Sequence, residues 1–292
     1  MDIAFNFNIV GLEGLGSTLT SLIRNCSDSQ KITLWFLCSD ILPTDKINIK
    51  QLLDNENFTG KINFIDFDAK KSFGELRPLH GDWSAYGRLL IPSKIDRDIV
   101  LYLDCDLIIL TDILELSNFN FSDRAIAAVY GSKIEDSFDK DLFINELKWP
   151  TDIGYFNSGV ILFNNKKWKE DNYDSRIKEL CHKFPNHFLA ADQTILNAVL
   201  KGNFKYLDAK YNMAWPPRNK QPENSEKGII HFVGSPKPWD LFGKSLHHGI
   251  KVWQTYHTPF WKKCYGALTL QKLVRTWHIR RSIIRHFGNK FA

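Results

Sequence analysis

Two aspartates stand two positions apart at the end of an apolar run, in a pattern that suits a divalent metal ion. Residues 99–103 are aliphatic or aromatic without polar alternation, which predicts a strand buried on both faces. Asp104 and Asp106 follow directly, at the edge where open α/β sheets bind ligands. Carboxylates this close repel each other, and Mg²⁺ or Mn²⁺ relieves the repulsion while bridging to a phosphate. The competing interpretation is a strand-end turn in which the aspartates cap backbone amides.

Apolar runs alternate with helical segments along most of the chain. The expected strands are residues 3–5, 32–37, 63–65, 99–103, 126–129, 159–163 and 228–231. The expected helices are one capped by Ser17 and ending near Asn25, then 44–54, 83–90 closed by Pro92, 173–182 and 192–200. This alternation predicts βαβ crossovers and an α/β fold with a mostly parallel central sheet.

The composition places the chain among ordinary globular proteins. It has 292 residues, of which 43% are hydrophobic and 24% charged. No apolar stretch approaches the roughly 20 residues of a membrane span, and the segment after Met1 does not read as a secretory signal. Five scattered cysteines without a Cys-x-x-Cys pair argue against a disulfide framework or a zinc site. We therefore expect a cytoplasmic protein.

The net charge of +5 is divided unevenly along the chain. Residues 241–292 hold ten Lys and Arg and no acidic residue, while residues 1–240 hold 28 basic and 33 acidic residues, a net charge of −5. This division predicts a catalytic domain over 1–240 and a basic helical C-terminal appendage over 241–292.

Apolar residues in this appendage recur at helix-like intervals, with arginines between them and Arg280 interrupting the apolar side. The apolar set is Leu270, Leu273, Val274, Trp277, Ile284 and Phe287. A basic helix with Trp and Phe on its apolar side is typical of helices that lie in an anionic membrane interface, here on the inner face of the cell membrane. The alternative is a helix docked on the catalytic domain with solvated cations. Nothing else in the chain indicates a nucleic-acid partner.

Three further segments carry polar side chains beside predicted strands or helices. Asn157 and Ser158 precede an apolar strand, and Gly159 permits close approach of a ligand or another backbone. Asp192 opens a helix beside Gln193 and is either its N-cap or a sugar-hydroxyl ligand. In the third segment, residues 231–239, a histidine is followed at three-residue steps by a glycine and a lysine. That spacing suits a loop wrapped over phosphates, since imidazole ligates Mn²⁺ and lysine is a point charge for phosphate.

Taken in order, these segments resemble the family 8 retaining glycosyltransferases, which include glycogenin and bacterial lipopolysaccharide galactosyl- and glucosyltransferases. The resemblance runs from Met1 to about Trp239, and it rests on the motifs LYLDCD at 101–106, FNSGV at 156–160, ADQ at 191–193 and HFVGSPKPW at 231–239. It implies a GT-A-type, Rossmann-like nucleotide-binding domain.

Carried over by motif, the resemblance implies a role for each matching residue. The residues that would bind Mn²⁺ (or Mg²⁺) on a UDP-sugar diphosphate are Asp104, Asp106 and His231. The donor-binding residues would be these three with Asn8, Arg88, Cys105, Asn157, Ser158, Asp192, Gln193, Gly234 and Lys237. Gln193 and Asp192 would lie at the reacting sugar as the catalytic pair.

Two positions depart from the family pattern. Relatives usually follow the first strand with an acidic residue and then Asn-Tyr to hold uridine, but this chain has Asn6, Phe7 and Asn8. The tyrosine that would stack on the base is therefore missing. Relatives often carry an aspartate toward the acceptor after the 126–129 strand, where this chain has Tyr130 and Gly131.

The resemblance implies transfer of glucose or galactose from the UDP-sugar to a glycan acceptor, with retention of configuration. The acceptor would be a bacterial surface glycan, lipid-linked or on a glycoprotein. Gln193 is a poor nucleophile, which favours front-face attack by the acceptor hydroxyl, with Asp192 as nucleophile the alternative. Two other functions are weighed. An Asp-x-Asp phosphotransferase would want Thr or Val at Leu107, and a non-catalytic sugar-nucleotide or membrane-binding module would be expected to lose part of the site.

Overall fold

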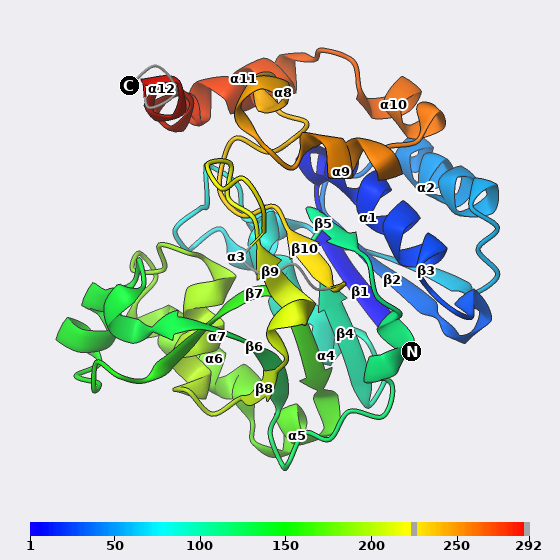
Figure 1. Cartoon of the computed structure of the whole chain (residues 1–292). Coiled ribbons are helices and arrows are strands. Elements are labelled where there is room, and N and C mark those ends of the chain that lie inside the picture. The colour runs from blue at the N-terminus through cyan, green and yellow to red at the C-terminus, as the bar shows by residue number, and fades with distance from the viewer. Residues whose placement is uncertain (223–226, 289–292) are drawn as a thin grey trace.

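Seven strands form one mixed sheet through the middle of the computed structural model, which describes residues 1–222 and 227–288 (Figure 1). The strand order is β3-β2-β1-β4-β7-β6-β8. The strands are β1 Asp2–Phe7, β2 Thr33–Cys38, β3 Lys61–Asp66, β4 Ile99–Leu103, β6 Ile126–Lys133, β7 Gly154–Asn164 and β8 Lys205–Leu207. β1, β2, β3 and β4 are parallel to their neighbours within this group, and only β7 runs antiparallel to β4 and β6. The predicted α/β fold with a mostly parallel sheet is confirmed.

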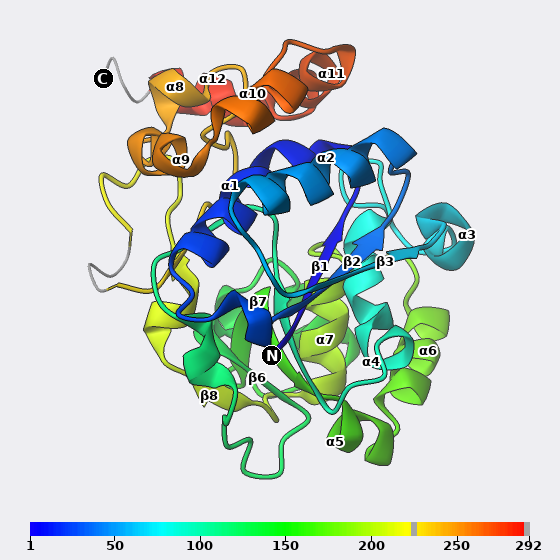
Figure 2. The ribbon, with the colours of Figure 1, turned by 90° about the vertical axis from the view of Figure 1, so that its right-hand side faces the viewer.

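Helices cover both faces of this sheet, as Figures 1 and 2 show. One face packs on α1 Leu12–Arg24 and α2 Pro43–Asn55. The opposite face packs on the 3-10 segment Ser84–Leu90 and on α4 Ile91–Lys94, α5 Asn165–Glu170, α6 Tyr173–Lys183 and α7 Asp192–Leu200. The short α3, Ala69–Phe73, packs on the 3-10 segment, where Phe73 stacks on Tyr86. The parallel strands are apolar without alternation because both faces are buried in this way.

A second, three-stranded sheet brings two distant parts of the chain together. It has the order β5-β10-β9, with β5 Leu107–Ile109, β10 Ile229–His231 and β9 Met213–Ala214. β10 is antiparallel to β5, and the register pairs His231 with Leu107. This pairing places His231 next to Asp106, which directly precedes β5.

The C-terminal helices lie across the end of α1 and α2 (Figure 2). They are α8 Gly243–Leu246, α9 Ile250–Tyr256, α10 Pro259–Tyr265, α11 Leu270–His278 and α12 Arg280–Gly288. Trp261 of α10 is fully buried, and its indole N–H donates to the carbonyl of Leu12 at 2.8 Å. The appendage predicted from residue 241 therefore shares a core with α1. Among the described residues, no helix combines the length and apolar character that a membrane span requires.

Three local predictions are wrong, and each has a physical reason. Ser17 does not cap a helix, because α1 begins at Leu12 and Ser17 is buried inside it. The 83–90 segment is 3-10 rather than α-helical, and Pro92 lies in the first turn of α4, where its missing N–H costs nothing. β7 begins five residues earlier than expected, at Gly154, so that Asn157 and Ser158 lie within the strand.

Candidate active site

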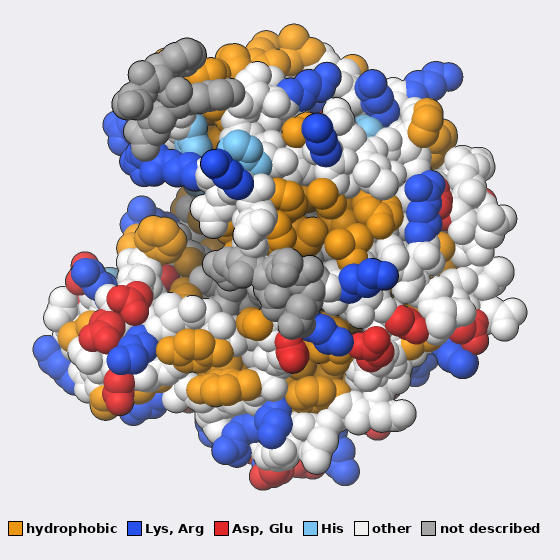
Figure 3. Space-filling model, in the orientation of Figure 1, with side chains coloured by type: hydrophobic (Ala, Val, Ile, Leu, Met, Phe, Trp, Pro, Cys, Tyr) orange, Lys and Arg blue, Asp and Glu red, His pale blue; other side chains and the backbone are white. Residues whose placement is uncertain are grey.

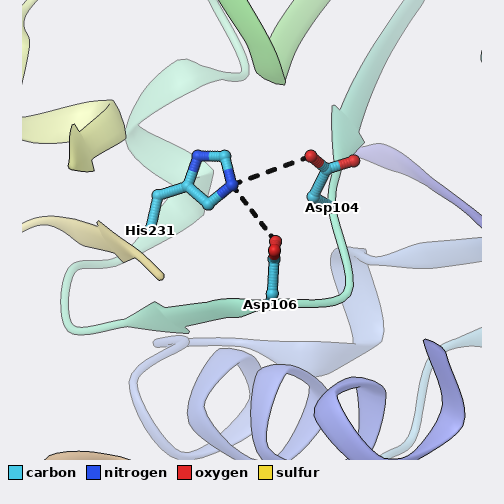
Figure 4. Close-up of side chains that lie close together, drawn as sticks. All are labelled: Asp104, Asp106 and His231. Atoms are coloured by element: carbon cyan, nitrogen blue, oxygen red, sulfur yellow. Dashed lines mark ion pairs between the residues drawn. The ribbon is translucent and has the colours of Figure 1, made fainter. Parts of the chain in front are cut away.

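Asp104, Asp106 and His231 converge at the carboxyl end of the central strands (Figure 4). Asp104 follows β4, Asp106 precedes β5, and His231 ends β10. His231 Nε2 lies 3.2 Å from Asp106 Oδ1 and 3.8 Å from Asp104 Oδ2. One ligand atom from each residue lies within 4.8 Å of the others. The structure thus brings together all three side chains that the resemblance implies as metal ligands.

The rear oxygen of each carboxylate is held by a hydrogen-bond donor. Asp104 Oδ1 accepts from the buried Tyr102 hydroxyl and from Arg88 Nη2 at 2.8 Å. Asp106 Oδ2 accepts from Lys237 Nζ at 2.5 Å. Burial opposes the charge on Asp106, yet the Lys237 ammonium holds the pKa of this carboxyl below its ordinary value. Both carboxylates therefore keep one oxygen, Asp104 Oδ2 and Asp106 Oδ1, directed at the imidazole.

The tautomer of His231 is set from behind by an asparagine. His231 Nδ1 lies 2.9 Å from Asn212 Oδ1. The Asn212 amide NH₂ donates to Asn157 Oδ1 at 3.1 Å, and that oxygen also accepts the Gly159 N–H at 3.0 Å. These bonds assign oxygen to the Asn212 atom that faces the histidine, so that Nδ1 carries the proton. Nε2 is left with a lone pair directed at the two aspartates.

The chain of hydrogen bonds continues through the sugar-site residues to a buried carboxylate. Asn157 Nδ2 donates to Gln193 Oε1 at 3.0 Å, and Gln193 Nε2 donates to the Tyr155 oxygen at 2.9 Å. The Tyr155 hydroxyl in turn donates to Asp139 Oδ2 at 3.4 Å. Every donor from His231 onward points toward Asp139, which is buried and accepts only. Such a one-directional chain is mutually polarising and fixes the orientation of each amide within it.

Two observations test whether this cluster fits a divalent cation. Asp106 Oδ1 is buried and has no hydrogen-bond donor, which costs about 1–3 kcal/mol unless a cation is present. A Cβ added to Gly159 would lie 2.3 Å from His231 Cε1 and 2.9 Å from Asp104 Oδ2. Only glycine therefore lets β7 pass this close behind the cluster. Two carboxylate oxygens and one imidazole nitrogen fit Mn²⁺ or Mg²⁺ in this place.

Arg88 joins the metal-ligand cluster to the predicted sugar site. Its guanidinium pairs with Asp104 Oδ1 at 2.8 Å and with Asp192 Oδ2 at 2.8 Å, and it donates to the Ser158 carbonyl at 2.7 Å. Burial raises the pKa of Asp192 to about 7 against the opposing effect of Arg88. Asp192 is the first residue of α7 rather than its N-cap, a position that Ala191 occupies.

Gln193 is held in one orientation by three neighbours. Besides Asn157 and Tyr155, Ser158 donates its backbone N–H to Gln193 Oε1 at 3.0 Å. Asn197 ties the same helix to β7, because its amide donates to the Phe156 carbonyl at 3.0 Å and accepts the Phe156 N–H at 3.0 Å. The start of α7 is thus fixed against the strand that carries Asn157 and Ser158.

The loop after His231 carries the two residues, Gly234 and Lys237, that the resemblance implies as phosphate contacts. Gly234 has φ of +74°, a left-handed conformation that glycine adopts without strain. Lys237 Nζ lies against Asp106 and the Phe232 carbonyl, and its charge therefore stands directly beside the metal-ligand cluster.

Cys105 and Asn8, two predicted donor-binding residues, lie beside the metal-ligand cluster. Burial, with Asp104 and Asp106 adding to it, raises the pKa of the Cys105 thiol well above its ordinary value. Cys105 is therefore a neutral thiol and a poor metal ligand. Asn8 Oδ1 accepts the Val10 N–H at 2.9 Å. Both residues line a cavity of about 550 Å³ that also contains Asp104, Asp106, Arg88 and Lys237.

Sequence reasoning missed Tyr102, Asn212, Asp139 and Tyr155. Tyr102 is hidden within the apolar strand, where an aromatic residue is ordinary. Asn212 lies two residues before Ala214, which pairs with His231; only this strand pairing reveals its role. The sequence offers one signal for Asn212: it is a polar residue between Tyr211 and Met213, which are both buried.

The fold and the site define a glycosyltransferase of the GT-A type, and the comparisons agree. The chain belongs to glycosyl transferase family 8, whose model matches residues 2–242. It is 27% identical to general stress protein A of Bacillus subtilis, over 77% of this chain and 82% of that protein. It is 25% identical to lipopolysaccharide 1,3-galactosyltransferase of Salmonella typhimurium, over 83% and 74% respectively. Other relatives are longer proteins, of which the match covers as little as 27%.

A solved structure supports the fold. The galactosyltransferase LgtC, crystallised in complex with donor and acceptor sugar analogs, aligns with a TM-score of 0.71. The alignment covers 93% of this chain and 98% of that one at 21% identity.

Replacing Asn212 by Leu, which has a similar volume and no hydrogen-bonding atom, should weaken Mn²⁺ binding roughly 10–100-fold. The physical reason is that His231 loses the acceptor that keeps the proton on Nδ1. Isothermal titration with Mn²⁺ measures the affinity, and long-range ¹H–¹⁵N correlation of the imidazole reports the tautomer. Asn203→Leu, at an exposed position, is the control. Unchanged affinity and tautomer in Asn212→Leu would refute this role.

Proposed function

We propose that this protein is a retaining hexosyltransferase that moves glucose or galactose from a UDP-sugar to a glycan acceptor, with Mn²⁺ (or Mg²⁺) bound by Asp104, Asp106 and His231. The observation that carries the proposal is the convergence of their three ligand atoms beside a cavity of about 550 Å³. Family membership and similarity to a lipopolysaccharide galactosyltransferase support the hexose and the glycan acceptor.

The leaving group determines what the phosphate side of the site must do. As the glycosidic bond breaks, negative charge develops on the departing diphosphate, and a bound divalent ion supplies Lewis-acid neutralisation there. Lys237 adds a fixed positive charge beside Asp106. The space beside the Gly234 backbone is open, since a Cβ there would meet no atom nearer than Pro217 Cδ at 3.9 Å. These groups are in place before the reaction and need no reorganisation.

On the sugar side, the anomeric carbon becomes oxocarbenium-like, as in glycoside hydrolysis. Asp192 is buried, and its Oδ2 is bound to Arg88 and the Ser158 hydroxyl, so that this oxygen is not free to attack. Gln193 is equally engaged, and its amide is a weak nucleophile. These contacts favour front-face attack by the acceptor hydroxyl, with the departing phosphate oxygen taking its proton, and Asp192 stabilising positive charge.

The two rival functions are less well supported. An Asp-x-Asp phosphotransferase needs a carboxylate free to attack phosphorus, whereas both aspartates here have their rear oxygen engaged and their front oxygen facing His231. A non-catalytic binding module would not need the ordered Arg88–Asp192–Gln193 arrangement. Family membership also favours glycosyl transfer over both.

Replacing Asp106 by Asn should lower Mn²⁺-dependent UDP release from UDP-glucose or UDP-galactose by orders of magnitude while leaving the melting temperature nearly unchanged. The amide removes the charge that binds the cation but keeps the volume. A panel of UDP-sugars, with truncated glycans as acceptors, identifies the substrate. Asp112→Asn, a nearby cap residue outside the cluster, is the control. Full activity in excess chelator would contradict the proposal.

Front-face transfer predicts an α-linked product from the α-configured UDP-hexose, without a covalent enzyme intermediate. Proton NMR of the new glycosidic linkage gives the configuration. Intact-mass spectrometry of the enzyme, quenched during turnover, should show no added hexose. A hexosyl adduct on the peptide that contains Asp192 would establish double displacement instead, and an inverted product would exclude retention altogether.

We further propose that the C-terminal appendage holds the enzyme on an anionic membrane, at the cytoplasmic face. Apolar side chains of α11 and α12 are exposed, with Leu273 at 46%, Trp277 at 66% and Ile284 at 68%. Lys and Arg side chains are spread over these C-terminal helices in Figure 3, and the sequence places no acidic residue there. Each cation near an anionic leaflet contributes about 1 kcal/mol. All five cysteines are free, which suits a reducing compartment.

Replacing Trp277 by Ser should reduce co-flotation with vesicles that contain phosphatidylserine or another anionic lipid, because the helix loses its interfacial anchor. Wild-type binding should also fall as salt increases. Phe138→Ser is the matched control, since Phe138 is 85% exposed on the catalytic domain. Binding that ignores both salt and the Trp277 substitution would show that the tail is not an electrostatic anchor.

A further inference from the structure

Helix α11 of the C-terminal appendage forms one wall of the cavity that opens from the metal-ligand cluster. The cavity of about 550 Å³ reaches from Asp104 and Asp106 to side chains of this helix. The helix contributes Leu270, Gln271, Val274, Arg275 and His278. The opposite walls come from the end of β1 and from residues 79–85. A segment some 165 residues away in sequence therefore encloses the same space as the two aspartates.

An arginine of this helix is tied to the loop that carries Lys237. Arg275 forms a fork on Asp240, with Nε at 2.5 Å from Oδ1 and Nη2 at 3.0 Å from Oδ2. Asp240 Oδ2 also accepts the backbone N–H of Lys237 at 2.6 Å. The Lys237 ammonium then reaches Asp106. Arg275 is thus connected to the metal-ligand cluster through two residues, without touching it.

Two more bonds hold the helices over the cavity. Lys272 Nζ pairs with Glu13 Oε2 of α1 at 2.6 Å. Ser282 of α12 donates to the Ser235 carbonyl at 2.6 Å, within the same loop as Lys237. The position of α11 and α12 is therefore set in part by polar contacts to α1 and to the loop that carries Lys237.

The side chains around the outer part of the cavity indicate the chemistry of a ligand. Val10 and Val274 supply apolar surface, and the Asn8 and Gln271 amides offer both donors and acceptors. His80, Arg275 and His278 add nitrogen groups to the lining, with the Asp82 carboxylate beside them. A flat, apolar ring with polar edges, linked to an anionic group, matches this lining. A nucleoside diphosphate has that composition.

We propose that α11 is part of the donor site: Val274 and Gln271 form the outer wall of the nucleobase pocket, and Arg275 is a positioning residue that holds the phosphate-binding loop through Asp240. This inference rests on the proposed function, because the diphosphate is placed at the metal-ligand cluster. It also accounts for the missing tyrosine after β1, since the base is covered from α11 instead.

The test compares two glutamate substitutions on adjacent residues of the same helix. Val274 and Leu273 are almost equally exposed, at 48% and 46%, but only Val274 lines the cavity. Isothermal titration of UDP in the presence of Mn²⁺ should show binding weakened roughly tenfold or more in Val274→Glu, since a charge would be buried against the base, and unchanged in Leu273→Glu. Ligand-observed NMR with uridine should show the same loss in Val274→Glu.

Arg275→Ala tests whether Arg275 positions the phosphate-binding loop or only stabilises the fold. It should weaken UDP several-fold but leave uridine binding unchanged, because Arg275 acts through Lys237 on the phosphates, and Arg275→Lys should restore part of the loss. Hydrogen exchange on the wild-type chain gives a measurement independent of any variant: UDP with Mn²⁺ should protect amides of residues 270–279. This inference would be overturned, and the proposed function left intact, if the wild type binds UDP, Val274→Glu has no effect, and UDP does not protect α11. Failure of the wild type to bind UDP would overturn the proposed function as well.

Discussion

Three lone pairs that face one another without a proton between them determine how the polar interior of this protein is organised. Asp104 Oδ2, Asp106 Oδ1 and His231 Nε2 all present acceptors to the same point. Such an arrangement is unfavourable by itself and is maintained only if each group is held from behind. Tyr102 and Arg88 hold the first aspartate, Lys237 the second, and Asn212 the imidazole. The cation that the cluster fits then offsets a repulsion already present in the fold.

This constraint reaches the sugar site because the supporting residues are shared. Arg88 holds both Asp104 and Asp192, and Asn157 links Asn212 to Gln193. The groups that face a diphosphate and the groups that face its sugar therefore belong to one hydrogen-bonded network. A network with all donors oriented toward one buried carboxylate has few alternative arrangements. Preorganisation of this kind is what electrostatic stabilisation of a leaving group requires.

The sequence predicts the strands and most helices of the catalytic domain because apolar periodicity records which faces are buried. It also predicts that Asp104 and Asp106 lie at a strand end, because they directly follow the apolar run in the sequence. It does not reveal Asn212 or Asp139, because their roles depend on pairing between β9 and β10 and on packing at the start of α7. Ser17 shows a further limit: its N-cap preference is real, but the close packing of α1 on the sheet extends the helix to Leu12.

The basic tail illustrates how one pattern serves two environments. The sequence predicts an apolar side interrupted by Arg280, and the structure divides its members. Val274 faces the cavity, while Leu273 and Trp277 remain exposed. Two isoleucines outside the predicted set, Ile279 and Ile283, pack with Leu246. A helix held mainly by charged pairs to Glu13 and Asp240 can meet water, lipid and ligand on different sides. Because the pair with Asp240 ends on the loop that carries Lys237, the position of the tail and the order of the phosphate-binding loop are physically linked.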